Sequence, residues 1–334
     1  AQRRVLNYLT QNTNDPRSIK ALEQLIPEFQ NIAIGISKTK SNVLVQPSLD
    51  ALVVLAKNGN ETAFAALKVI AFDKKTNPSE RESVAISIRD LAYEKKDTVT
   101  ISAVSELIFS DLIEDSRKFD PRAGTSQGRP YKLIDALVYL VQLKGNEALS
   151  VELREEVLNS LVRLVQTEKF MANQRTQAEA SVSVIKFLTR NVNDTQVRAA
   201  LEQLVPEFQN IVLGNRETLV INDSLEALGI LAQVNSELAF TALRTIALDK
   251  RTGERERDFV AIKLRDLAYE KRSAATIDAV TEMIFSDLID DKRKFDPQSR
   301  PSSVGEKPYK LIDALVYLLL QGRQEVCPPL VKVV

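Results

Sequence analysis

The residue types that usually carry catalysis are scarce in this chain. Its 334 residues include no histidine, and Cys327 is the one cysteine. The usual general base near neutral pH, the Ser-His and Cys-His nucleophile pairs and the commonest zinc ligand are therefore missing. Adjacent carboxylates such as Glu114 and Asp115 are expected by chance at this acidic content, and no Gly-rich phosphate loop is present. We expect no catalytic residues, no metal and no cofactor.

Polar residues that recur at matching positions in two similar stretches are the better candidates for function. They are Gln24, Glu28, Asn31, Glu106, Ser110 and Asp111, with counterparts Gln203, Glu207, Asn210, Glu282, Ser286 and Asp287. Two interpretations are open. These side chains are either solvated or paired with their neighbours, or they form a mildly acidic, amide-rich groove for a basic or polar segment of a partner.

A recurring basic loop is the alternative site. It carries Arg117, Lys118 and Phe119, repeated as Arg293, Lys294 and Phe295, before a variable run rich in Gly, Ser and Pro. Long loops in tight arrays are often functional, so a basic anchor for an anionic ligand is one interpretation. In the other, Phe119 fills a hydrophobic core while Arg117 and Lys118 neutralise the C-terminus of the preceding acidic helix. The Arg89–Asp90 dipeptide, repeated at Arg265, predicts ion pairs between repeats.

These recurrences belong to a duplication of most of the chain. ALEQLIPEFQNI at Ala21 returns as ALEQLVPEFQNI at Ala200, and IFSDLIEDSRKFDP at Ile108 returns as IFSDLIDDKRKFDP at Ile284. The repetition defines two blocks, residues 1–179 with four helical hairpins and residues 180–334 with a shortened last helix. Self-similarity on this scale is typical of repeat architectures.

Helix signals dominate each block, and eight helices are expected in the first. Asp15 before Pro16, Asn77 before Pro78 and Asn60 are typical N-caps, and the first of these helices is expected to run to about Ile34. Some helices are apolar on two sides, as a helix between neighbours in a stack requires. We therefore expect an all-α fold, a right-handed α-solenoid of about eight helical hairpins.

One hairpin carries a family resemblance. Asp194, Val197, Arg198, Ala200 and Leu201 fill the positions of an N-cap Asp, a Val-Arg pair and packed small and Leu residues, and the sequence from Asp15 to Leu22 is a weaker match. This hairpin resembles a HEAT repeat, and the chain as a whole resembles HEAT and armadillo solenoids. The resemblance implies binding of proteins or nucleic acids along a concave face, which the second helix of each hairpin would line.

Charge and composition narrow the expected function. Lys plus Arg and Asp plus Glu number 45 each, which argues against a general polyanion binder. No stretch approaches the roughly 20 apolar residues of a membrane span, and a single thiol fits a cytoplasmic setting. We expect a non-catalytic scaffold that binds a protein or peptide, basic or extended, along the concave face, as the solenoid arm of a larger signalling or assembly protein. The alternatives are a nucleic-acid-binding solenoid and a HEAT-like lyase or regulatory subunit acting on a small cofactor.

Overall fold

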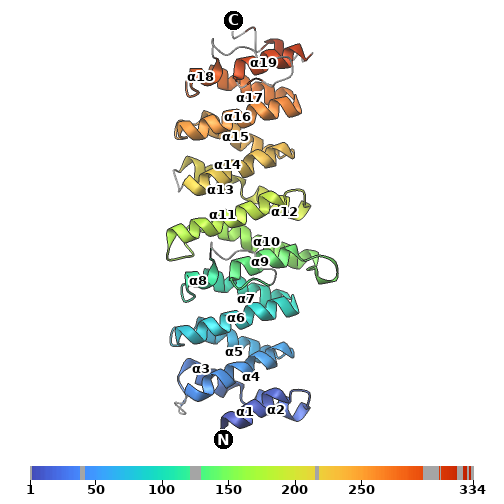
Figure 1. The fold of residues 1–334 in the computed structure, drawn as a ribbon, viewed down its shortest axis with the longest axis vertical. Coiled ribbons are helices and arrows are strands. Elements are labelled where there is room, and N and C mark those ends of the chain that lie inside the picture. The colour runs from blue at the N-terminus through green and yellow to red at the C-terminus, as the bar shows by residue number, and fades with distance from the viewer. Residues whose placement is uncertain are drawn as a thin grey trace. The chain divides into compact units, whose positions relative to one another are not determined.

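The computed structural model describes residues 2–37, 42–120, 129–214, 218–295, 308, 310–321, 326–328 and 331. All regular structure in these ranges is helical, and none of it is strand, which confirms the predicted all-α class (Figure 1). The variable runs after Phe119 and Phe295 lie mostly outside the described residues. The chain separates into two compact units, Ala1–Ala180 and Ser181–Val334, which are described one at a time.

Unit 1 contains ten complete α-helices among its described residues and two short 3₁₀ helices. They are α1 (Gln2–Gln11), α2 (Pro16–Gln24), α3 (Ile26–Ile34), η1 (Asn42–Leu44), α4 (Val45–Lys57), α5 (Glu61–Phe72), α6 (Pro78–Lys95), α7 (Thr98–Phe109), α8 (Asp115–Lys118), α9 (Leu133–Gln142), η2 (Gly145–Glu147) and α10 (Val151–Gln166). Helix α11 (Gln174–Arg190) crosses the boundary between the units.

Unit 2 repeats most of this order. Its helices are α12 (Thr195–Gln203), α13 (Val205–Leu213), α14 (Thr218–Gln233), α15 (Glu237–Leu248), α16 (Glu254–Lys271), α17 (Ala274–Phe285), α18 (Asp291–Lys294) and α19 (Leu311–Leu320).

The predicted helix starts are confirmed by their capping bonds. The side chain of Asp15 accepts from the Arg17 N–H, that of Asn60 from the Ala63 N–H, and that of Asn77 from the Ser79 N–H. Each cap satisfies a backbone donor that the first helical turn leaves unpaired. Short local signals therefore set where these helices begin.

The prediction of one helix from Pro16 to about Ile34 is wrong. The chain breaks at Leu25, between α2 and α3, and the equivalent break in unit 2 falls at Leu204. Pro27 and Pro206 follow these breaks, and a proline inside a helix removes one hydrogen bond and clashes with the carbonyl four residues earlier. A proline in the second position of a new helix avoids both costs.

Helices of unit 1 pack in two layers. Helices α1, α4, α6 and α9 contact one another in order, and α3 contacts α5 while α7 contacts α10. The side chains of Lys68 on α5 and Glu106 on α7 join the second set into one layer, the α3–α5–α7–α10 layer. Residues such as Leu52, Leu67 and Ile88 are fully buried between the layers, and each contributes about 1.5–3 kcal/mol.

Unit 2 shows the same pattern of contacts. Helices α13, α15 and α17 form one layer, and α14, α16 and α19 form the other. The two duplicated sequences thus build the same two-layer arrangement, each within its own unit.

Candidate interaction surface

The recurring polar residues of unit 1 lie in the α3–α5–α7–α10 layer or at its edge. Gln24, Glu28, Glu106 and Asp111 are exposed, and Asn31 and Ser110 are half-buried. The first three positions belong to α2 and α3, whereas the last three belong to α7 and the turn after it, and α5 lies between the two groups. The structure therefore divides the predicted set in two.

Their counterparts in unit 2 are distributed in the same way. Gln203, Asn210 and Asp287 are exposed, while Glu207, Glu282 and Ser286 are half-buried. The hydroxyls of Ser110 and Ser286 each accept from a backbone N–H two residues later, at 3.2 Å, so both serines shape the turn that follows their helix.

Glu106 and Glu282 are held by cations of the neighbouring helix. Lys68 Nζ lies 2.8 Å from a carboxylate oxygen of Glu106. In unit 2, Arg244 of α15 binds both oxygens of Glu282, with its Nε 2.6 Å from Oε2, and this hydrogen bond raises the pKa of Arg244. Exposed pairs of this kind contribute at most about 1 kcal/mol. They do reduce the negative charge that either glutamate offers to a partner.

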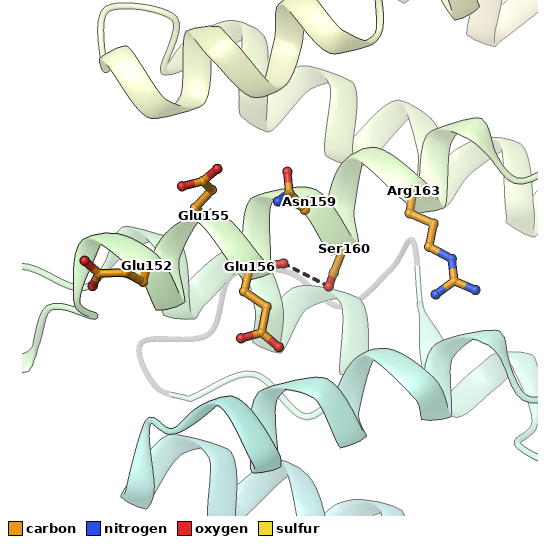
Figure 2. A pocket seen from close by; sticks show the side chains of 6 residues that line it. All are labelled: Glu152, Glu155, Glu156, Asn159, Ser160 and Arg163. Atoms are coloured by element: carbon orange, nitrogen blue, oxygen red, sulfur yellow. Dashed lines mark hydrogen bonds between the residues drawn. The ribbon is translucent and has the colours of Figure 1, made fainter.

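A more acidic surface, made of residues outside the predicted site, lies along α10. A hollow of about 410 Å³ follows the solvent side of this helix. Its lining residues are Glu152, Glu155, Glu156, Asn159, Ser160 and Arg163. Figure 2 shows them along one helix, with Glu152 at one end and Arg163 at the other. We call this surface the α10 groove.

The environment of the groove differs along its length. Near the helix N-terminus, the pKa of Glu152 is lowered by hydrogen bonds that its carboxylate accepts from the backbone N–H of Glu152 and from the side chain of Ser150. Partial burial raises the pKa of Glu156, against the effect of a hydrogen bond with Thr98 of α7. At the other end the guanidinium of Arg163 lies 4.4 Å from the centre of the Phe109 ring, a cation–π contact. The three carboxylates of the groove thus span about one turn near the helix N-terminus, and one cation lies at the other end.

The signal for this groove was present in the sequence. Glu152, Glu155, Glu156, Asn159 and Arg163 recur at intervals of three and four residues, which places them on one helical face. The opposite face of α10, which includes Val157, Leu158 and Leu161, is apolar and buried.

The basic loop forms α8 and its flanks, and its cations are engaged within each unit. Arg117 lies 3.0 Å from the carboxylate of Glu82 on α6, and Arg293 lies 2.9 Å from that of Asp258 on α16. Arg117 therefore pairs with an acidic side chain of another helix, and the prediction that it neutralises the preceding helix terminus is wrong.

Lys118 and Phe119 are both buried in unit 1. Lys118 Nζ donates to the carbonyl of Phe170 at 2.7 Å, and burial lowers the pKa of this lysine. The prediction that Phe119 fills a core is confirmed, since 6% of it is exposed, but its counterpart Phe295 is 49% exposed.

The Arg89–Asp90 pair also differs from its prediction. The guanidinium binds the carboxylate of its own neighbour at 2.6 Å, within α6, so the pair does not join two repeats. The same guanidinium does reach the next hairpin, where it donates to the carbonyl of Tyr131 at 2.6 Å.

Neither protein-family models nor curated proteins yield a match to this chain. Among the described residues, no three His, Cys, Asp or Glu side chains converge as metal ligands. The described helices also include none with the length and apolar character needed to cross a membrane. Inference about function therefore rests on the chemistry of the exposed surfaces.

Proposed function

We propose that this chain is a non-catalytic interaction scaffold of the HEAT and armadillo type, in which the helical hairpins form a right-handed α-solenoid. Each unit binds a basic, extended segment of a protein partner along the layer formed by the second helices of its hairpins. In unit 1 this is the α3–α5–α7–α10 layer. A cytoplasmic location, suggested by the single thiol, belongs to the same proposal.

The observation that carries the proposal is the α10 groove. Three carboxylates follow one another along a single helix, with the amide of Asn159 beside them and one cation at the far end. Carboxylates accept hydrogen bonds from Lys and Arg side chains, while the amide can pair with the backbone of an extended peptide. Because the net charge of the chain is zero, attraction of a basic segment depends on this local surface.

The hairpin that resembles a HEAT repeat supports the architectural part of the proposal. Asp194 accepts from the N–H groups of Gln196 and Val197, and Arg198 Nε donates to the carbonyl of Val192 at 3.1 Å. Ala200 and Leu201 are buried behind them. Each residue that carries the resemblance therefore has a definite role in closing or packing the hairpin.

Titration calorimetry with a basic probe tests the proposal. The probe is an octapeptide of alternating lysine and serine, and the protein is the full chain at low and high salt. We expect the double change Glu152→Lys and Glu155→Lys to weaken binding at least tenfold at low salt, since two attractive contacts become repulsive. The matched control, Asp50→Lys with Glu94→Lys, makes the same charge change on α4 and α6 of the other layer.

The control should bind the probe within about twofold of the parent, because exposed charges at a distance are screened. If both double variants lose affinity equally, attraction depends on overall charge and the groove is not the site. If neither loses affinity, the acidic surface is not used at all.

A further inference from the structure

A small hollow of about 150 Å³ lies within unit 2 and is lined by α11 and α14. Its lining residues are Lys186, Thr189, Arg190, Asp223, Glu226 and Ile230. The first three belong to α11 and the last three to α14, and within each helix they are three or four residues apart, which places each set on one helical face. All six belong to unit 2. We call this hollow the α11–α14 pocket.

The pocket carries charges of both signs. Lys186 and Arg190 provide two cations on α11, and Asp223 and Glu226 provide two carboxylates on α14. Lys186 Nζ lies 3.5 Å from Oδ1 of Asp223, which is longer than the roughly 2.7–2.9 Å of a strong charged hydrogen bond. Arg190 is exposed and has no ion-pair partner among the described residues. One cation is thus loosely paired, and the other is available to a ligand.

Asp223 is a buried carboxylate with little compensation for its charge. Only 9% of this residue is exposed. Burial raises the pKa of Asp223, the nearby Lys186 acts against this effect, and the negative charge of Glu226 adds to it. A buried carboxylate is stable when close donors pair with it and satisfy its oxygens. An ammonium group of a ligand would supply such donors.

The hydroxyl of Thr189 is also incompletely paired. Its oxygen is buried and has no hydrogen-bond partner among the described residues. The equivalent hydroxyl of unit 1, that of Thr10, donates to the carbonyl of Leu6 at 2.8 Å. Buried polar atoms are rarely left unpaired. The pocket therefore offers an unused donor next to Arg190 in the sequence.

The duplicated sequence shows that the fold does not require these charges. In the first copy, uncharged residues stand at three of the pocket positions, namely Asn7 for Lys186, Gln11 for Arg190 and Pro47 for Asp223. The helices that carry them, α1 and α4, pack against each other within unit 1. Packing alone therefore does not explain a buried carboxylate and two cations at this place in unit 2.

We propose that the α11–α14 pocket binds a small aliphatic α-amino acid in its zwitterionic form. Asp223 and Glu226 accept from the ammonium group, and Arg190 donates to the carboxylate. The Thr189 hydroxyl donates to the same carboxylate after a change of rotamer, and Ile230 contacts the aliphatic side chain. The hollow of about 150 Å³ is smaller than the roughly 300 Å³ of the smallest pockets for drug-sized ligands, which favours a ligand of this size.

A zwitterion fits the pocket better than an ion of one sign. An amine alone would leave Arg190 without a partner, and a carboxylic acid alone would leave Asp223 with its one loose contact. An α-amino acid carries both groups a short distance apart and engages both sides of the pocket. The site belongs to unit 2 and is separate from the α10 groove of unit 1, so either assignment can fail without the other.

Saturation-transfer NMR on the full chain, with L-alanine as the probe, tests the proposal. We expect saturable binding of L-alanine. Ethylamine and propionate each retain one of its two charged groups and should bind at least tenfold more weakly, because one charged contact is lost. Asp223→Asn should weaken L-alanine binding at least tenfold, since the ammonium group loses its charged partner.

Two further variants separate the two ends of the ligand from general charge effects. Arg190→Gln, which gives this exposed position the side chain of the first copy, should weaken L-alanine binding at least fivefold and leave ethylamine affinity within twofold. The matched control is Asp50→Asn, at the exposed position of unit 1 that corresponds to Glu226, and it should leave L-alanine affinity within twofold. Circular dichroism of each variant checks that its helices persist.

Absence of saturable L-alanine binding to the parent chain would overturn the proposal. Equal affinities for L-alanine and ethylamine would also overturn it, because the pocket would then be a simple cation site. If the Asp223→Asn and Arg190→Gln variants both bind L-alanine as the parent does, the amino acid binds elsewhere on the chain and the assignment to this pocket is wrong.

Discussion

One set of tyrosine contacts, here called the seam, is the same in both units. The surroundings of the short helices α8 and α18, here called the two corners, are not the same. In unit 1 the hydroxyl of Tyr93 donates to the carbonyl of Pro130 at 2.9 Å, and its ring packs edge-on against Tyr139. In unit 2, Tyr269 makes the same two contacts with Pro308 and Tyr317, at 2.8 Å for the hydrogen bond and 5.5 Å between ring centres.

The corners differ in the partners that the described residues provide for them. Both partners of each tyrosine contact are encoded within the duplicated sequence, so the contact is duplicated as well. The partners of Lys118 lie near Phe170, beyond the last residues that the two described copies share in structure. Where both partners are repeated among the described residues, the contact is therefore repeated with them.

The largest expected contrast is between the two corner phenylalanines. Phe119→Ala should cost about 3–5 kcal/mol of unfolding free energy, because it leaves a cavity in a packed site. Phe295→Ala should cost less than about 1 kcal/mol, because half of that side chain is already in water. Urea unfolding of the two variants, followed by circular dichroism, measures the difference. Equal losses would mean that the two corners are covered alike in solution.

The lysines of the corners should show a smaller contrast in the same direction. Lys118→Ala removes a buried donor and leaves the Phe170 carbonyl without it, at a cost of about 1–3 kcal/mol. Lys294→Ala removes only an ion pair with an exposed carboxylate and should cost less than about 1 kcal/mol. Differential scanning calorimetry compares them. A Lys294 variant as unstable as the Lys118 variant would contradict the comparison.

The seam tyrosines should respond equally. Tyr93→Phe and Tyr269→Phe each delete one hydrogen bond to a proline carbonyl, worth about 0.5–1.5 kcal/mol. Burial raises the pKa of both phenols, so each keeps donating throughout the neutral range. Chemical denaturation of the two single variants should give losses that agree within about 0.5 kcal/mol. A clear inequality would show that the seams are not equivalent.

Asp135, in the first turn of α9, should give a modest effect on stability that depends on pH. Burial raises the pKa of Asp135 from 3.8 to about 6. The folded state binds this proton more tightly than the unfolded state, so the contribution of Asp135 to stability falls as pH rises from about 4 to about 6. Asp135→Asn should therefore stabilise the chain at pH 7, on the order of 1 kcal/mol after allowance for solvent screening.

At pH 4 the parent and the Asp135→Asn variant should have similar stability, since the carboxyl is then protonated in most folded molecules. Asp111→Asn, at an exposed site, is the control and should change stability by less than about 0.5 kcal/mol at either pH. A benefit of Asp135→Asn that is the same at pH 4 and pH 7 would show that ionisation is not its cause.

How far the sequence predicts this structure depends on the range of the interactions. Helix starts at Asp15, Asn60 and Asn77 were predictable because a cap and its partner lie within three residues. The break before Pro27 was missed because the apolar pattern continues through it, although the proline itself was visible.

The candidate surfaces show the same limit. The exposure of Phe295 could not be predicted from a motif that it shares with the buried Phe119. The neighbouring Lys118 of that motif depends on a carbonyl 52 residues away. The acidic face of α10 was encoded locally by its glutamate spacing and could have been found. The pairing of Glu106 with Lys68 required the helix packing.

Photo-crosslinking tests the central claim, recognition of a basic segment by the α10 groove, most directly. The lysine–serine octapeptide would carry one photoreactive residue, and mass spectrometry of the full chain would locate the attachment sites. The account predicts cross-links concentrated within Val151–Gln166 and lost in the Glu152→Lys, Glu155→Lys variant. Cross-links that instead concentrate on α4 and α6, or that persist on α10 in that variant, would contradict it.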